Sequence, residues 1–174
     1  MIRVAIFAVC VFASSCAGTR GDVASAPDPD DVAVRAAVDT LYAVVSGEKG
    51  VARPWERLKE LFVPEGYFCI SGVGRDGKPR SRTFSVDAFV EGASRNAAEE
   101  SFYERPMVTR VEVFGGVASV WSSYASSRTR NGEPFARGVN AFTLIKTAEG
   151  WRFCVVAWSE ESPGLRLPAA LRDH

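Results

Sequence analysis

The sequence has almost no histidine, and this shortage removes several kinds of chemistry from consideration. Its one histidine is His174, the last residue of the chain. A serine–histidine–aspartate triad and a histidine-ligated metal centre both need a histidine held in place by the fold. We therefore expect no metal site and no histidine-dependent hydrolysis.

The sequence also lacks an excess of either charge and lacks a long apolar run. Lysine and arginine number 21, as do aspartate and glutamate, so the net charge is zero. Binding of nucleic acid usually needs a basic surface, so we expect no nucleic-acid partner. The longest apolar run, residues 4–13, falls well short of the ~20 residues that cross a bilayer.

The first residues have the pattern of an export signal. A basic start at Arg3, the apolar run and the small residues before Cys16 predict a signal peptide over residues 1–15. Ala13 to Cys16 resembles a bacterial lipobox, which predicts lipidation of Cys16. An ordinary secretory signal cut near Ala17 is the alternative. The protein is then expected in the cell envelope or periplasm, as an outer-membrane lipoprotein touching the membrane only through its anchor, or else secreted.

Composition divides the rest of the chain into three parts. Residues 16–29 are rich in small residues and proline and predict a flexible tether. Residues 30–161 carry the periodic apolar pattern of one folded domain, and residues 162–174 form a C-terminal tail. Cys69 and Cys154 lie in apolar strand-like segments of the domain, where we favour two buried thiols over a disulfide.

Apolar spacing predicts helices in the first half of the domain and strands in the second. A first helix, capped by Asp30 or Asp31, is expected up to about Gly47, with an apolar stripe at Val34, Val38, Leu41 and Val45. A short second helix follows Pro54, and Ser85 is expected to cap a third. The strands are expected at 66–72 and 79–84, as a hairpin, and then at 102–114, 117–129, 135–147 and 151–160, as an antiparallel meander.

Two of these strands are apolar at nearly every position, namely Val139 to Ile145 and Phe153 to Trp158. An antiparallel strand with that pattern must be covered on both faces. The helices cover one face, and a second copy of the chain is the expected cover of the other. The sequence thus predicts a homodimer.

The order of elements resembles a known superfamily. Helix, short helix, hairpin, helix and four-stranded meander, closed by Gly150-Trp151-Arg152-Phe153, look like the nuclear transport factor 2-like superfamily, including its SnoaL-like domains. The resemblance covers roughly residues 31–161 and implies an α+β, cone-shaped fold, with a strongly curved antiparallel sheet and three helices on one face. Because that superfamily includes isomerases, dehydratases, cyclases and non-catalytic modules, it implies no single function.

A glycine-rich segment matches the dinucleotide-binding pattern, but its context does not. Residues 72–77 read G-x-G-x-x-G, and Lys78-Pro79 then leads into a strand and not into a helix. The pattern binds pyrophosphate only where a helix opens at its end. We interpret it as a hairpin turn and expect no nucleotide and no other cofactor.

Few residues remain that could act in catalysis or ligand binding inside the cone. No aspartate lies on the meander strands, and Glu104 is expected to pair with Arg110 or Arg137 on a solvated surface. The serines at 122, 123, 126 and 127 are expected to face solvent. Tyr124, Asn140 and Trp158 combine apolar area with a polar group, so they are the predicted ligand-binding residues.

Three functions stay open on this pattern. The favoured one is a non-catalytic binder of a small apolar or amphipathic molecule, with no catalytic residue assigned. The second is an isomerase- or dehydratase-type enzyme that uses Glu104 with Tyr124 or Asn140, which requires Glu104 to point inward with a raised pKa. The third is an interaction module whose cone is filled. An open cavity beside a buried carboxyl group would favour the enzyme.

Overall fold

The computed structural model describes residues 27–74 and 76–172. The predicted signal peptide, Cys16, most of the tether and His174 lie outside the described residues. The described elements, in chain order, are α1 (Pro29–Val45), α2 (Trp55–Glu60), β1 (Phe62–Val73), β2 (Pro79–Ser85), α3 (Val86–Glu99), β3 (Tyr103–Phe114), β4 (Val117–Ser127), β5 (Pro134–Thr147), β6 (Gly150–Glu160) and the 3-10 turn η1 (Ala169–Leu171).

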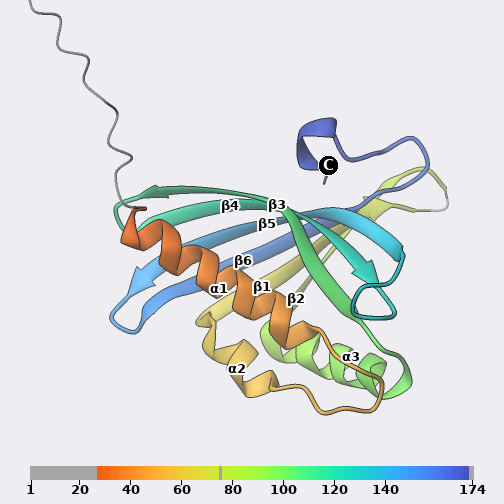
Figure 1. Cartoon of the computed structure of the whole chain (residues 1–174), viewed down its shortest axis with the longest axis horizontal. Coiled ribbons are helices and arrows are strands. Elements are labelled where there is room, and N and C mark those ends of the chain that lie inside the picture. Colours follow the sequence, from red (N-terminus) through yellow and green to blue (C-terminus); the bar gives the residue numbers. More distant parts are fainter. Residues whose placement is uncertain (1–26, 75, 173–174) are drawn as a thin grey trace, which may run out of the picture.

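The described strands form one curved sheet in the order β2-β1-β6-β5-β4-β3. β3 to β6 form the predicted antiparallel meander, and β1 adds to it by pairing in parallel with β6. Figure 1 shows α1, α2 and α3 on one side of the sheet and the C-terminal segment on the other. The α+β class, with a curved sheet and three helices on one face, is confirmed.

The helix starts follow local hydrogen bonding. Ser85 caps α3 as predicted, because its Oγ accepts from the backbone N–H of Ala88 at 3.2 Å. The predicted cap of α1, Asp30 or Asp31, was wrong. Asp28 caps it, accepting from Asp30 N at 2.9 Å, because Pro29 already occupies the first turn. Asp30 instead accepts from Trp151 Nε1 at 3.1 Å and so joins α1 to β6.

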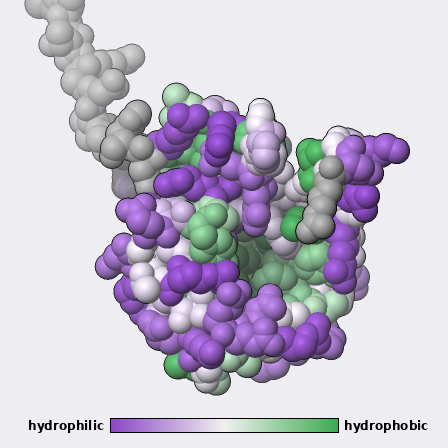
Figure 2. Space-filling view, turned by 90° about the vertical axis from the view of Figure 1, so that its right-hand side faces the viewer, coloured by the Kyte–Doolittle hydropathy of each residue, from purple (hydrophilic) through white to green (hydrophobic). Residues whose placement is uncertain are grey.

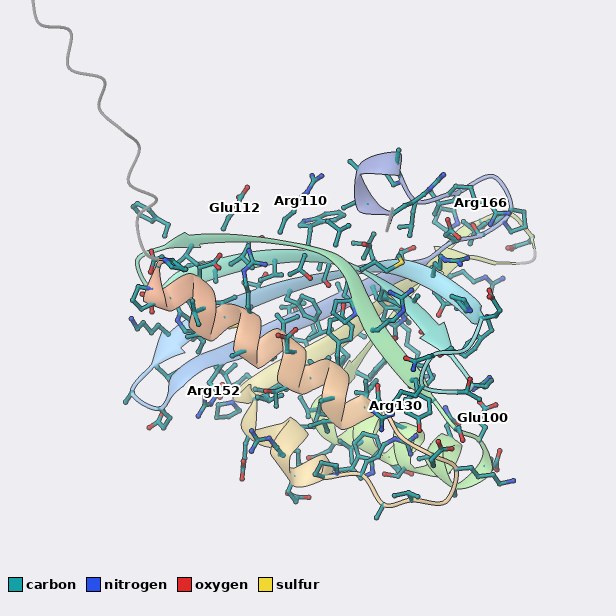
Figure 3. All side chains as sticks on the ribbon, viewed as in Figure 1. Glu100, Arg110, Glu112, Arg130, Arg152 and Arg166 are labelled. Atoms are coloured by element: carbon teal, nitrogen blue, oxygen red, sulfur yellow. The ribbon has the colours of Figure 1, made fainter. Side chains whose placement is uncertain are left out.

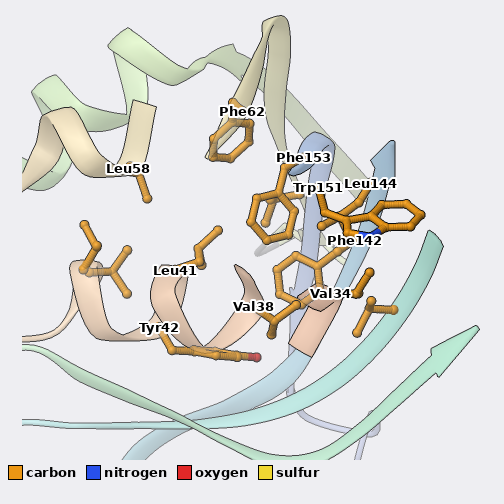
Figure 4. Close-up of a cluster of buried hydrophobic side chains, with 14 of the residues drawn as sticks. Val34, Val38, Leu41, Tyr42, Leu58, Phe62, Phe142, Leu144, Trp151 and Phe153 are labelled. Atoms are coloured by element: carbon orange, nitrogen blue, oxygen red, sulfur yellow. The ribbon is translucent and has the colours of Figure 1, made fainter. Parts of the chain in front are cut away.

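The apolar core lies between α1 and the middle of the sheet. The predicted stripe of α1 faces inward, with Val34 and Val38 at most 1% exposed. Figure 4 shows these side chains packed against the aromatic rings of β5 and β6, and Phe142 and Phe153 lie 5.4 Å apart between ring centroids. Burying each side chain of this size stabilises the fold by about 1.5–3 kcal/mol.

The outer face of the sheet is covered in part by the chain itself. Residues past the predicted domain end at 161 fold back, with Leu167 and Leu171 buried. Arg110 Nη2 donates to the carbonyl of Ala170 at 3.3 Å on this side. Cys69 and Cys154 are half-buried and unpaired. No helix within the described ranges is long and apolar enough to cross a bilayer.

Candidate functional site

All three predicted ligand-binding residues lie on the helix-facing side of the sheet. Asn140 on β5 stands directly opposite Trp158 on β6, and Tyr124 on β4 stands opposite Gly138 on β5. Tyr124 belongs to the buried core, and Trp158 packs against that core. Asn140 reaches the hydroxyl of Tyr42 on α1, which fixes its direction too. The pleat thus brings the three to one interior surface.

Glu104 joins this surface, contrary to the expectation of a solvated pairing with arginine. It pairs with Ser126 across β3 and β4. Asn140 Nδ2 donates to its Oε1 at 3.1 Å, and Ser126 Oγ donates to its Oε2 at 3.1 Å. Arg110, one of the expected partners, lies on the outer face (Figure 3). Glu104 is therefore an interior carboxyl group held by two neutral donors.

A β-bulge in β3 sets this direction. Glu104 and Pro106 pair with Ser126 and Tyr124, but the register shifts between Pro106 and Val108. Beyond the shift the odd-numbered residues face inward, so Glu112 points to the outer face (Figure 3). A bulge adds one residue to one strand, so it reverses the alternation of side chains. Two glutamates eight residues apart consequently have opposite surroundings.

Burial changes the acidity of Glu104. Loss of water around the carboxylate raises the pKa of Glu104 from 4.5 to about 7. The hydrogen bonds from Asn140 and Ser126 act in the opposite direction, and the charge of Glu160 raises the pKa further. Near neutral pH the group is thus populated in both its protonated and its ionised form, the condition under which a carboxyl group best exchanges protons.

Asn140 links Glu104 to a chain of hydroxyl groups. The same Nδ2 that donates to Glu104 also donates to Tyr42 Oη at 3.1 Å. Tyr42 in turn donates to Ser122 Oγ at 2.8 Å, and Ser122 lies 3.0 Å from Thr109 Oγ1. Both amide hydrogens of Asn140 are therefore used, which fixes the side chain. Desolvation raises the pKa of Tyr42, so it stays a neutral donor.

The expectation that the serines of β4 face solvent was wrong. Ser122 and Ser123 are 0% exposed, and Ser126 and Ser127 are also buried. Ser122 and Ser126 lie on the inner face with Asn140 and Glu104, and Ser123 Oγ accepts from Val108 N at 3.1 Å across β3 and β4. Their hydroxyl groups find internal partners, as buried polar groups must.

Tyr124 contributes a hydroxyl group of a different kind. It is 2% exposed, and its Oη would lie 2.6 Å from a Cβ placed on Gly138, so only glycine leaves it room. Among the described residues Tyr124 has no hydrogen-bond partner. Desolvation, and then the charges of Glu104 and Glu160, raise the pKa of Tyr124, so the phenol stays protonated. A neutral donor without an acceptor therefore lies near Glu104.

An open cavity of about 430 Å³ lies at the α3 end of this interior. Its apolar wall is formed by Phe84, Phe89, Phe102 and Trp158. Figure 2 shows a hollow with apolar residues inside and polar residues around it. The volume falls in the range of small-molecule sites.

Of the predicted residues, Trp158 lines the cavity, whereas Tyr124 and Asn140 do not. The acid lies just behind the wall, two residues after Phe102 on the chain and bonded to Asn140, the partner of Trp158 across the strands. Glu104 as a whole residue is half-buried, but its carboxyl group is itself buried behind this wall. Within the described ranges no three metal-ligating side chains gather in one place.

Comparison with known proteins identifies the architecture. No protein-family model and no curated protein matches this sequence. A solved nuclear transport factor 2-like protein with a cystatin-like fold, from Novosphingobium aromaticivorans, has 20% identity and a TM-score of 0.59, over 82% of this chain and 86% of its own. The chain has the nuclear transport factor 2-like fold.

Two further solved structures agree with this assignment. A member of the same family from Streptomyces avermitilis, provisionally named a dehydratase, has 18% identity and a TM-score of 0.56, over 79% of this chain and 99% of its own. A second Novosphingobium aromaticivorans protein, provisionally named an aromatic ring hydroxylase, has 14% identity and a TM-score of 0.57, over 80% and 94%.

Several residues of this site in the nuclear transport factor 2-like fold were not predicted from the sequence. Tyr42 follows Leu41 of the apolar stripe of α1 and was not singled out. A buried tyrosine needs a hydrogen-bond partner for its hydroxyl group, and that requirement could have pointed to it. Ser126 follows Tyr124 by two residues, so the alternation of β4 could have placed both on one face. Arg53, which also lines the cavity, lies in a loop with no periodic pattern, and no sequence signal pointed to it.

Proposed function

We propose that this protein is an acid–base enzyme of the isomerase type, acting on a small, largely apolar molecule bound at the α3 end of the cone. The observation that carries the proposal is Glu104: an interior carboxyl group bonded to Asn140 and Ser126, with its pKa raised to about 7. Strongly shifted carboxyl groups beside cavities are typical of catalytic sites. The sequence favoured a binder because this acid was expected on a solvated surface.

The proposed reaction moves a proton next to a carbonyl group. Ionised Glu104 takes a proton from the carbon beside the carbonyl; the C–H bond breaks, and its electron pair passes to the carbonyl oxygen. The Tyr124 hydroxyl group donates a hydrogen bond to that oxygen as its charge develops. In a β,γ-unsaturated carbonyl compound, protonated Glu104 then returns the proton to the γ-carbon. The electron pair on oxygen re-forms the C=O bond, the C=C bond moves from the β,γ to the α,β position, and the enzyme is unchanged.

Asn140 and Ser126 position the carboxyl group in this scheme. Each donates to one oxygen of Glu104, so the ionised form is stabilised and the group stays oriented. Without these donors, burial alone would raise the pKa of Glu104 further. The dehydratase name of the Streptomyces avermitilis protein is compatible with proton chemistry on this fold.

A second candidate is the non-catalytic binder that the sequence favoured. The observation in its favour is that Trp158 lines the cavity whereas Glu104 lies behind the wall. In that case the protein would hold a small molecule without changing it.

Proton exchange in D₂O separates the two candidates. The protein is incubated with a panel of small apolar β,γ-unsaturated ketones, and deuterium uptake and isomerisation are followed by NMR. We expect uptake with the unaltered protein and loss of it with Glu104→Gln. Glu112→Gln is the matched control, because it lies on the same strand but on the outer face. Binding of a ketone without exchange would favour the non-catalytic binder.

Location and assembly are also proposed from the sequence. We propose that the protein is exported, carries a lipid on Cys16 and pairs with a second copy through the outer face of its sheet. Trp121, at 53% exposed, and Ile145 are apolar on that face. An intact mass without a lipid would contradict the anchor. Sedimentation as a monomer at high micromolar concentration would contradict the dimer.

A further inference from the structure

Arg53 is a buried arginine with an incomplete set of partners. It lies in the loop between α1 and α2 and is 7% exposed. Its Nε donates to the carbonyl of Val45 at 3.0 Å, and its Nη2 donates to the carbonyl of Gly47 at 2.8 Å. These bonds satisfy carbonyl groups at the C-terminal end of α1. Its Nη1 is buried and, within the described part of the chain, has no hydrogen-bond partner.

No described carboxylate compensates this charge. The ion pairs of the described residues do not include Arg53, although buried arginines are normally paired. Arg53 lines the cavity beside Phe102 and Trp158. A buried cation with a spare donor thus lies in the wall of an apolar cavity.

Most of the other charged side chains around the cavity are also positive. Its wall also contains Arg82, Arg95 and Arg128, against a single acid, Glu100. Arg95 pairs with Glu91, and Arg128 pairs with Glu100. Arg82 lies 5.5 Å from the ring of Phe84 and is in no described ion pair. The cavity therefore attracts anions and repels cations.

We propose that the natural ligand is a small carboxylic acid, whose carboxylate binds Arg53 Nη1 while its apolar body lies against Phe84, Phe89 and Trp158. This inference rests on the proposed function, because it assumes that the cavity binds a small molecule. Nε and Nη2 of Arg53 already donate to backbone carbonyl groups. Nη1 can therefore donate to one carboxylate oxygen, but Arg53 cannot form a bidentate pair with the ligand. Such a contact suits one end of a carboxylate.

Binding of a ligand to Nη1 requires a side chain of the cavity wall to move. Nη1 is shielded from water in this structure, so the carboxylate reaches it only after a side chain of the wall rotates. Rotations of this kind are common when small molecules bind. Once the contact is made, the charged pair lies in an apolar environment, where it discriminates strongly against a neutral ligand.

Two probes of matched shape test the inference. 2-Naphthoate carries the carboxylate, and 2-naphthylmethanol replaces it with a neutral hydroxymethyl group. Trp55 and Trp158 both line the cavity, so their fluorescence reports binding. We expect 2-naphthoate to bind the full chain about tenfold tighter than the alcohol, or more, because charge-assisted hydrogen bonds are roughly twice as strong as neutral ones.

Substitutions then locate the charge. Arg53→Met should reduce the affinity for 2-naphthoate to that for the alcohol and leave the alcohol unchanged, whereas Arg82→Met should preserve most of the preference. A preference lost in Arg82→Met but kept in Arg53→Met would overturn the assignment to Arg53. Since Arg53 also supports the end of α1, its variant needs a check of folding by circular dichroism.

The comparison of the two probes with the unaltered protein does not depend on that variant. Equal affinity for acid and alcohol would overturn the inference while leaving a cavity that binds small molecules. Failure of both probes to bind would overturn the inference and count against the site itself. Loss of exchange in Glu104→Gln is a separate result, so failure of the proposed reaction is distinguishable from failure of the carboxylate preference.

Discussion

The inner face of the sheet has two halves that share the same strands. Towards one end, β4 and β5 present Val120 opposite Phe142 and Ala118 opposite Leu144, all at most 1% exposed. Towards the other, the same strands present Ser122 opposite Asn140, which reaches Glu104. A step of two residues changes an apolar interior into a polar one.

The difference separates what holds the fold together from what gives it chemistry. The apolar half is close-packed against α1 and removes hydrocarbon from water, which is the dominant favourable contribution to folding. The polar half buries hydroxyl, amide and carboxyl groups, each of which needs a partner to avoid a cost. We expect substitutions in the apolar half to lower stability, and substitutions in the polar half to change pH dependence and proton transfer.

Phe153→Ala tests the apolar half and should have the largest effect on stability. Phe153 is 0% exposed and contacts the rings of Phe62 and Phe142. Truncation of a buried phenylalanine lowers the free energy of unfolding by about 3–5 kcal/mol. Phe114→Ala is the matched control, because Phe114 is 91% exposed and should change stability by less than about 0.5 kcal/mol. Urea denaturation measures both, and similar losses would refute the distinction.

The burial of Glu104 should make the free energy of unfolding fall as pH rises. Its pKa is about 7 in the folded chain against 4.5 for an ordinary glutamate, so the folded state binds more protons between these limits. The contribution is fully present below pH 4.5 and is lost as pH rises through 7. A difference of this size corresponds to about 3 kcal/mol.

Glu104→Gln removes this dependence because the amide does not titrate. The variant should be as stable as the unaltered protein near pH 5, and more stable by up to about 3 kcal/mol near pH 8. Thermal unfolding scans at both values measure the difference, with Glu112→Gln, on the outer face of the same strand, as the matched control. A variant less stable than the unaltered protein at pH 8 would be incompatible with a costly buried charge.

The sequence anticipated the apolar half well, because its signals are periodic. The spacing of Val34, Val38 and Leu41 defined the inner stripe of α1. Turn residues placed the hairpins of the meander, at Gly115-Gly116, Asn131-Gly132 and Glu149-Gly150. The parallel pairing of β1 with β6 was not anticipated, since strand periodicity carries no information about partners distant in the chain. Fold class therefore followed from local pattern and turn chemistry.

The polar half was anticipated only in part. Tyr124, Asn140 and Trp158 do share the inner face, because β4, β5 and β6 keep their alternation in register there. The direction of Glu104 depended on the bulge in β3, for which the sequence offers no clear sign. Regular alternation along β3 would put Glu104 and Glu112 on the same face of the sheet, whereas in the structure they lie on opposite faces. The acid was consequently expected in solvent.

Tyr124→Phe should change stability less than Phe153→Ala or Glu104→Gln does and still change the chemistry. Because the hydroxyl group has no partner among the described residues, its removal breaks no hydrogen bond, and the free energy of unfolding should change by less than about 1 kcal/mol. Proton exchange on the ketone panel should fall about 10²-fold, the usual effect of removing one donor to a developing oxyanion. An unchanged exchange rate would remove Tyr124 from the mechanism.

Titration of Glu104 by NMR distinguishes a buried, proton-exchanging carboxyl group from an ordinary one. The chain is labelled with ¹³C at the glutamate side-chain carboxyl carbons, and their resonances are followed from pH 3 to pH 9, with Glu104→Gln used to assign the signal. We expect the Glu104 resonance to titrate with a pKa of about 7. A Glu104 pKa near 4.5 would contradict the buried, proton-exchanging carboxyl group on which the account depends.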